Sequence, residues 1–136
     1  MIRQKVDVLR QYASQIKSVA ELYYRQTRGV RFLFVVGHML SGSSLLMHVL
    51  NSHPSILGYG ETHRRYHGVA DLVHLEREVL EKLHVSRGGT PSYRYVADKI
   101  LHNYVLDEDV LGVRSLKMLV SVRSPERSLP SILDLG

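Results

Sequence analysis

The sequence predicts an α/β domain with a mainly parallel β-sheet, preceded by a long N-terminal helix. Short runs of β-branched and aromatic residues alternate along the chain with segments whose apolar residues recur every three to four positions. The most apolar of these runs, residues 31–36, is hydrophobic on both faces, which is typical of a parallel strand between two layers of helices. With 136 residues, of which 44% are hydrophobic, the chain is long enough for one domain with its own core.

The first predicted element is an amphipathic helix over residues 2–27. Its apolar residues recur at three- to four-residue steps, with arginine, glutamine and lysine between them. Gly29 is a typical helix stop. We therefore divide the chain into an N-terminal helix, residues 1–28, and an α/β portion, residues 29–136. The apolar positions of the helix are Ile2, Val6, Leu9, Ile16, Val19 and Leu22.

The remaining elements follow the strand at 31–36 in alternation. Pro54 ends the helix that begins at Ser43, and Pro125 lies in the first turn of the last helix. The glycine-containing stretch 86–92 predicts a loop. We expect helices at 43–51, 69–83 and 126–133, and strands at 55–59, 93–97 and 116–122.

Composition and charge exclude several classes of protein. Cysteine is absent, which excludes disulfides and thiolate metal sites, and the eight histidines show no zinc-type spacing, so we expect no metal. The formal net charge of +5 suits an anionic ligand, but the basic residues form no stripe, so we do not expect nucleic-acid binding. No apolar run is long enough to span a membrane, and the charged N-terminus does not read as a signal peptide. We expect a cytoplasmic protein.

The segment between the strand at 31–36 and the helix at 43–51 has the composition of a phosphate-binding loop. Glycines allow a tight backbone path, and the start of a helix offers N–H groups to an anion. Gly37 and Gly42 also match the glycine spacing of a Walker A loop, although Ser43 replaces its lysine. The alternative is a plain strand-to-helix turn with a serine N-cap. The candidate binding residues are His38, Ser41, Gly42, Ser43 and Ser44.

A second candidate segment follows the predicted strand at 116–122. In a parallel sheet, ligands bind beyond the carboxyl ends of the strands, where both segments would lie. Arg123 can offer a planar fork of donors to a phosphate, and Ser131, on the next helix, can add a hydroxyl. By itself this segment favours a solvated arginine and a capping serine, and it is its combination with the first segment that favours a phosphate site.

Together the two segments resemble the sulfotransferases that use 3′-phosphoadenosine 5′-phosphosulfate (PAPS). Residues 39–44, Met-Leu-Ser-Gly-Ser-Ser, stand where that family has Pro-Lys/Arg-Ser-Gly-Thr-Thr, and Arg123-Ser-Pro125 with Ser131 reproduces its Arg-x-Pro and following serine. His53-Pro54 followed by Glu61 is similar to the HP…E stretch of bacterial and Golgi-type members, and Asp98-Lys99 to a pair in the middle of such chains. The resemblance implies a three-layer, P-loop-like domain that binds PAPS as donor without a metal, with Arg123 and Ser131 on the 3′-phosphate.

The chain departs from that family at two points. Leu40 replaces the lysine or arginine of the loop, which normally neutralises charge on the leaving oxygen. The cations that could take over this task are His38, Arg64, Arg65 and Lys99. The chain also ends soon after Ser131, whereas family members continue, so we expect an incomplete sheet that either lacks a C-terminal half or pairs in a homo-oligomer.

In the expected reaction, the hydroxyl or amine of an acceptor attacks the sulfur of the donor while a base removes its proton. The resemblance makes Glu61 the first candidate for this base, and His63 the second, because imidazole titrates near neutral pH. The alternatives are a solvated loop carboxylate and a surface histidine. Two other functions stay open: a degenerate P-loop nucleotide kinase or NTPase, and a non-catalytic, sulfotransferase-like interaction module.

Overall fold

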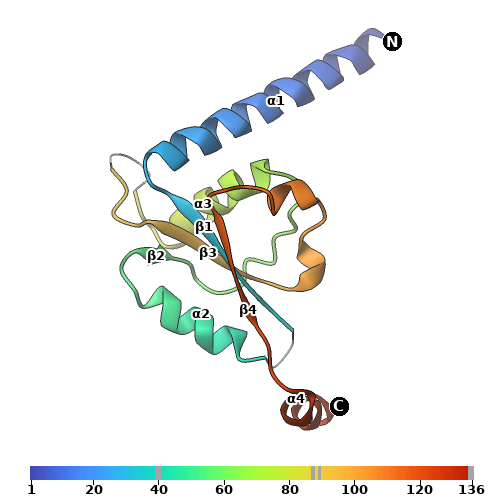
Figure 1. The fold of residues 1–136 in the computed structure, drawn as a ribbon. Helices are drawn as coiled ribbons and strands as arrows, with labels where there is room; N and C mark the ends of the chain where they lie inside the picture. The colour runs from blue at the N-terminus through green and yellow to red at the C-terminus, as the bar shows by residue number, and fades with distance from the viewer. Residues whose placement is uncertain (39–40, 87, 89, 135–136) are drawn as a thin grey trace.

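Four parallel strands form one sheet in the order β2-β3-β1-β4 (Figure 1). The computed structural model describes residues 1–38, 41–86, 88 and 90–134, without the side chains at positions 102, 128, 131 and 132. All strand pairs are parallel, which confirms the predicted α/β class with a parallel sheet. The strands are β1 Arg31–Gly37, β2 Ile56–Leu57, β3 Tyr95–Ile100 and β4 Leu116–Ser121.

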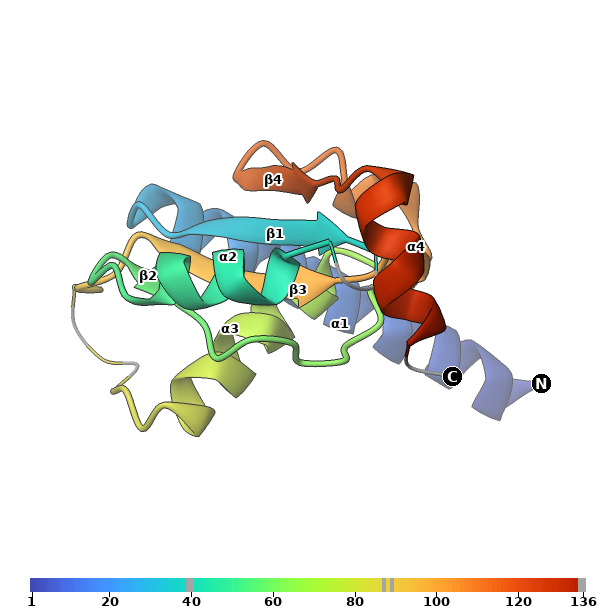
Figure 2. The same cartoon turned by 90° about the horizontal axis from the view of Figure 1, so that it is seen from below.

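Helices lie on both faces of the sheet. Helix α2, Ser43–Asn51, covers one face, and α3, Ala70–Lys82, covers the other together with the end of α1, Ile2–Thr27. Helix α4, Pro125–Leu133, lies past the carboxyl ends of β1 and β3 (Figure 2). The domain therefore has three layers, with one end of the sheet free for a site.

The alternation of side chains along β1 divides the core into two clusters. Leu33 and Val35 point to one face, where they pack with Met47 of α2. Phe32 and Phe34 point to the other face and join the larger cluster beneath α3, in which Phe34 stacks at a tilt on Tyr66 with ring centroids 4.6 Å apart. Because both faces of β1 are covered, its run of hydrophobic residues is explained by burial.

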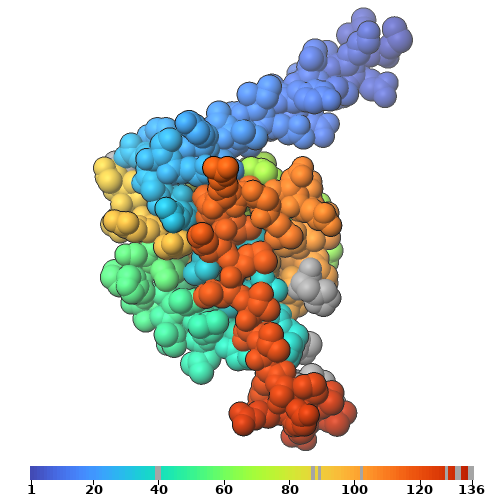
Figure 3. All heavy atoms as spheres, in the orientation of Figure 1, coloured from blue at the N-terminus to red at the C-terminus, as the bar shows by residue number. Residues whose placement is uncertain are grey.

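Helix α1 is attached to the domain by its C-terminal end only. Leu22 is buried in the large cluster, and Arg25 forms a buried ion pair with Glu76 of α3, with Nη2 2.6 Å from Oε1. The first turns of the helix extend away from the body (Figures 1 and 3). The apolar residues that predicted an amphipathic helix are therefore mostly exposed, and of those six only Leu22 enters the core.

Some elements begin or end at other residues than predicted. The strand expected at 93–97 lies at Tyr95–Ile100, and β2 is shorter than the expected 55–59. Strand β3 continues through the charged residues Asp98 and Lys99, because both side chains find hydrogen-bond partners. Two 3₁₀ turns, His102–Tyr104 and Glu108–Val110, were not predicted. Their hydrophobic residues pack under the α3 face of the sheet.

No helix among the described residues is long and apolar enough to cross a lipid bilayer.

Candidate functional site

Residues from all four strand ends surround one cavity at the carboxyl edge of the sheet. Its volume is about 420 Å³. The loop after β1, the loop after β2, the end of β3 and the turn after β4 each contribute to its wall. The sequence-predicted residues that line it are His38, Gly42, Ser43, Ser44, Glu61 and Arg123, and Lys99 joins them.

The strand order explains why the cavity forms there. Strands β1 and β3 are neighbours, but the segments that follow them lie on opposite faces of the sheet. The chain after β1 continues into α2 on one face, and the chain after β3 continues into the 3₁₀ turns on the face covered by α3. Where two adjacent parallel strands diverge in this way, the connecting loops leave a crevice between them. The sequence could place residues at strand ends, but the order of the strands decides which ends are adjacent.

The loop after β1 folds back tightly over the end of that strand. A Cβ atom on Gly37 would lie 2.5 Å from Ser41 Oγ and 2.9 Å from Ser43 Cβ, so only glycine fits. Gly42 has φ +85°, a left-handed conformation that favours glycine, and it caps the start of α2. Ser121, at the end of β4, donates from Oγ to the carbonyl of Ser41 at 2.9 Å. Two glycines thus permit the path of this turn, and the hydrogen bond from Ser121 holds Ser41 in place.

The serines of this loop have different environments. Ser41 and Ser43 are buried, and Ser41 does not line the cavity. Ser44 is exposed, and its Oγ accepts a hydrogen bond of 2.9 Å from Lys99 Nζ. An anion at this loop would therefore meet the first N–H groups of α2 and Ser44 rather than the Ser41 hydroxyl.

Two residues of the sequence prediction cannot be placed in the site. Leu40, the departure from the sulfotransferase loop, lies outside the described residues. Ser131 belongs to α4 by its backbone, but its side chain is outside the described part of the chain. The pairing of Arg123 with Ser131 on one phosphate stays a prediction.

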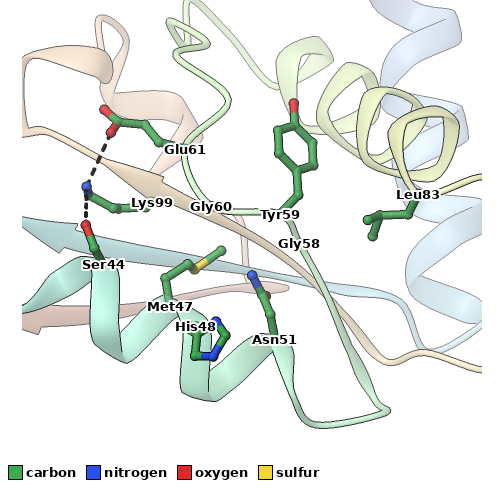
Figure 4. A pocket seen from close by; sticks show the side chains of 10 residues that line it. All are labelled: Ser44, Met47, His48, Asn51, Gly58, Tyr59, Gly60, Glu61, Leu83 and Lys99. Carbon is green, nitrogen blue, oxygen red and sulfur yellow. Dashed lines mark hydrogen bonds and ion pairs between the residues drawn. The ribbon is translucent and has the colours of Figure 1, made fainter.

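Lys99 connects the phosphate loop to the candidate base. Its Nζ lies 2.9 Å from Ser44 Oγ and 3.3 Å from Glu61 Oε2 (Figure 4). The side chain is only 17% exposed, so solvent screens this cation weakly. The alternation of β3 directs Lys99 to the α2 face, whereas Asp98 points to the opposite face. Lys99 thus brings to the loop a positive charge that residues 41–44 lack.

Glu61 is held by three neighbours. Tyr104 donates to its Oε1 at 3.0 Å, Lys99 pairs with its other oxygen, and His63 Nδ1 lies 3.5 Å from Oε1. Burial tends to raise the pKa of Glu61, but the hydrogen bond from Tyr104 and the charge of Lys99 outweigh it, so the pKa is lowered below its ordinary value. Glu61 is therefore ionised at neutral pH and able to accept a proton.

His63 lies beside the site rather than in it. Its side chain is 72% exposed and does not line the cavity, and its backbone has φ +59°. Its Nδ1 lies 3.3 Å from the Tyr104 hydroxyl. The structure thus separates the two candidate bases: Glu61 lines the cavity and His63 is on its outer rim.

Asp98 fixes the segment that carries Glu61. Its buried carboxylate accepts hydrogen bonds from the Thr62 N–H (2.9 Å), the Thr62 hydroxyl (2.8 Å) and the Tyr66 hydroxyl (2.7 Å). Burial raises the pKa of Asp98 and, with the adjacent carboxylate, also that of Tyr66. The sequence alone assigns Asp98 no such role, and the contributions of Tyr66 and Tyr104 had no sequence signal.

A second cavity of about 580 Å³ adjoins the first (Figure 4). The two share Ser44, Glu61 and Lys99. Its other walls come from α2, from the segment 58–60 and from Leu83 after α3, and they mix apolar and polar side chains. A ligand in one cavity would therefore approach a ligand in the other across Glu61 and Lys99.

Comparisons of this chain with protein families, with curated proteins and with solved structures found no match. Within the described residues, no three histidine or carboxylate side chains are grouped so as to hold a metal ion. The arrangement itself provides a helix N-terminus, two cations and one ionised carboxylate around a connected pair of cavities. These groups can bind an anionic ligand and accept a proton from a second molecule beside it.

Proposed function

We propose that this chain forms the donor-binding part of a sulfotransferase that moves a sulfuryl group from PAPS to a hydroxyl or amine acceptor. The observation that carries the proposal is the convergence of Ser44, Lys99, Arg123 and Glu61 on one cavity at the carboxyl edge of the sheet. These residues lie far apart in the sequence and come from four different strand ends. The sulfotransferase-like motifs of the sequence supply the choice of donor.

The donor carries two anionic groups, a 5′-phosphosulfate and a 3′-phosphate, and the cavity has two cations, Lys99 and Arg123, that could pair with them. The 5′-phosphosulfate would lie on the N-terminus of α2, next to Ser44 and Lys99. The 3′-phosphate would lie against Arg123, whose guanidinium suits a phosphate oxygen pair. In this arrangement Lys99 replaces the cation that Leu40 removes from the loop.

The reaction requires one proton transfer and one displacement at sulfur. The acceptor oxygen or nitrogen attacks the sulfur while the bond from sulfur to the bridging phosphate oxygen breaks, and its electron pair leaves with adenosine 3′,5′-bisphosphate. The proton of the acceptor goes to the Glu61 carboxylate. Lys99 offsets the negative charge that develops on the departing oxygen.

The contact between Lys99 and Glu61 links donor binding to the strength of the base. In the structure Lys99 contributes to the lowered pKa of Glu61. A bound phosphosulfate would draw Lys99 toward its own charge, and the pKa of Glu61 would then rise toward values at which a carboxylate is a better base. The acceptor would occupy the second cavity, because Glu61 and Lys99 lie on the boundary of the two cavities.

Nucleotide kinase or NTPase activity is the second candidate, favoured by the glycine frame of the loop and by Asp98 on the strand beside β1. A metal-binding aspartate must expose its carboxylate to the nucleotide. The carboxylate of Asp98 is instead buried and accepts three hydrogen bonds from Thr62 and Tyr66. This geometry favours the sulfotransferase proposal.

Ligand titration followed by thermal unfolding tests the proposal. Adenosine 3′,5′-bisphosphate should raise the melting temperature at concentrations where ATP and adenosine 5′-monophosphate do not, because a ligand that binds the folded state stabilises it. Arg123→Ala should abolish the preference for the 3′-phosphate, while Arg114→Ala, an exposed arginine outside the cavity, should leave it unchanged. Equal responses to ATP and the bisphosphate, or none to either, would overturn the proposed donor.

Transfer itself is measured with sulfur-35-labelled PAPS and a panel of hydroxyl and amine acceptors. Glu61→Gln should keep donor binding and lose most of the transfer, since the amide cannot take the proton. His63→Gln is the matched control and should retain activity. Full activity of Glu61→Gln would remove Glu61 as the base, and donor binding without transfer to any acceptor would favour a non-catalytic binding module.

A further inference from the structure

Helix α1 turns a mostly polar side, with Leu22 on it, toward the domain and most of its apolar residues away from it. Ser18, Leu22 and Arg25, at steps of four and three residues, mark the side that faces the body, where Leu22 and Arg25 are buried. A residue two positions away lies about 200° around a helix, on the opposite side. Ile16 and Tyr23 are such residues, and both are 69% exposed.

The outward side carries a continuous apolar stripe. Ile2, Leu9, Ile16 and Tyr23 follow each other at seven-residue steps, with Val6, Ala13 and Ala20 between them. Ile2 is 80% and Leu9 67% exposed. The stripe is about 30 Å long, at 1.5 Å per residue. A soluble domain rarely leaves so large a contiguous apolar surface in water, so we expect a partner for it.

The charges beside the stripe point to an anionic partner. The basic residues of the first two-thirds of α1 are Arg3, Lys5, Arg10 and Lys17, and its one acidic residue there is Asp7. Arg3, Arg10 and Lys17 recur at seven-residue steps along one border of the stripe. A second copy of the helix would bring these cations against each other, which opposes self-association.

The shape of the apolar side favours a flat partner over a helix. Val8 and Tyr12 are also exposed and widen the apolar arc well beyond the narrow seam that a two-helix coiled coil buries. Ala13 and Ala20 within the stripe offer little to a helix that packs by interlocking large side chains. Tyrosines such as Tyr12 and Tyr24 are typical of the water–lipid boundary.

We infer that α1 binds the surface of a bilayer containing anionic phospholipid, lying in the plane of the headgroups with its apolar side in the acyl boundary. This binding mode needs a broad apolar arc with lysine and arginine beside it. In α1, Arg3, Arg10 and Lys17 follow one border of the arc, and Lys5 lies near Ile2 and Leu9. The domain is compatible with it, because the first turns of α1 extend past the body (Figure 3) and the stripe lies opposite the buried Leu22 and Arg25. The inference is independent of the function proposed for the site.

Vesicle co-sedimentation of the full chain tests the inference. Vesicles of phosphatidylcholine with one quarter phosphatidylglycerol should bind the protein about tenfold more tightly than pure phosphatidylcholine, and added salt should reduce the difference. Leu9→Glu with Ile16→Glu should abolish binding to both. Arg10→Gln with Lys17→Gln should remove most of the preference for the anionic vesicles. The matched control, Gln11→Glu, adds a charge on the body-facing side and should bind nearly as the unaltered chain does.

Circular dichroism and thermal unfolding of each variant establish that it is folded, so lost binding reports on the helix surface. Absence of binding to anionic vesicles by the unaltered chain would overturn the inference. So would binding that the double glutamate substitution leaves intact. Sedimentation equilibrium tests whether a second copy of the chain covers the stripe instead. A dimer that Leu9→Glu with Ile16→Glu dissociates, together with no binding to vesicles, would refute the lipid assignment.

Discussion

Lys99 and Glu61 form an ion pair, with Nζ 3.3 Å from Oε2, at the junction of the two cavities of the site. The same ammonium group donates to Ser44 at the start of α2. One cation therefore connects the phosphate loop to the candidate base. This arrangement makes Lys99 the residue through which anion binding and proton transfer would influence each other.

Removal of the Lys99 charge should weaken anion binding at the loop. We expect Lys99→Met to reduce the affinity for adenosine 3′,5′-bisphosphate by about 10- to 100-fold, since a hydrogen bond to a charged group contributes roughly 1.5–3 kcal/mol. Isothermal titration calorimetry measures this loss. Lys117→Met, on the exposed strand β4 and outside both cavities, is the control. An unchanged affinity in Lys99→Met would refute the assignment of this cation to the donor.

A methyl group on Gly37 should displace the phosphate loop. Because Ser41 Oγ would be 2.5 Å from the new Cβ, we expect Gly37→Ala to cost about 1–3 kcal/mol of unfolding free energy and to lose nucleotide binding. Urea unfolding measures the stability. Gly68→Ala, at a position where a Cβ meets nothing within 4 Å, should leave both properties nearly unchanged.

The Glu61 ion pair should make a pH-dependent contribution to stability. The folded pKa of Glu61 is lowered from 4.5, so its contribution is present above the unfolded pKa and is lost as the pH falls through the folded one. Urea unfolding at pH 7, 5, 4 and 3 should show Glu61→Gln less stable than the unaltered chain at neutral pH, with the difference shrinking in acid. A difference that grows as the pH falls would contradict the lowered pKa.

The buried ion pair between Arg25 and Glu76 should account for the attachment of α1. Arg25 donates from Nε to Glu76 Oε2 at 2.7 Å and pairs through Nη2 with Oε1, which also accepts a 2.7 Å hydrogen bond from Tyr93. Arg25→Met therefore removes both guanidinium donors from a buried carboxylate. We expect this change to cost about 3–5 kcal/mol. Arg77→Met, which breaks the more exposed pair with Glu21, should cost about 0–1 kcal/mol. Equal losses in the two variants would show that burial does not govern this contact.

The parts of the fold that follow from local pattern were predictable. The strand at 31–36, the helix at 43–51 and the helix started by Pro125 all lie where the sequence places them, because apolar periodicity, glycine and proline act within a few residues. The parallel arrangement also followed from the alternation of strands and helices. It implied that 37–44 and Arg123 lie at the same edge of the sheet, and both segments reach one cavity there.

Other features required contacts between distant segments. The sequence named Lys99 as one of four cations that could serve the loop, but only the insertion of β3 between β2 and β1, with Lys99 on the α2 face, selects it. The hydrogen bond from Tyr104 to Glu61 and that from Tyr66 to Asp98 likewise join residues 43 and 32 positions apart. Patterns among neighbouring residues cannot predict contacts between residues so far apart in the sequence.

By itself the sequence determined the class of the fold, the glycine-containing turn between β1 and α2, and the amphipathic character of α1, since each depends on the order of neighbouring side chains. Only the tertiary structure decided the strand order, the meeting of Lys99 with Glu61, and the direction in which α1 turns its apolar side. A helix can bury either of its sides, and here Leu22 and the ion pair of Arg25 with Glu76 are buried while Ile16 and Tyr23 stay exposed. Which contacts form between distant segments is decided by packing the whole chain at once.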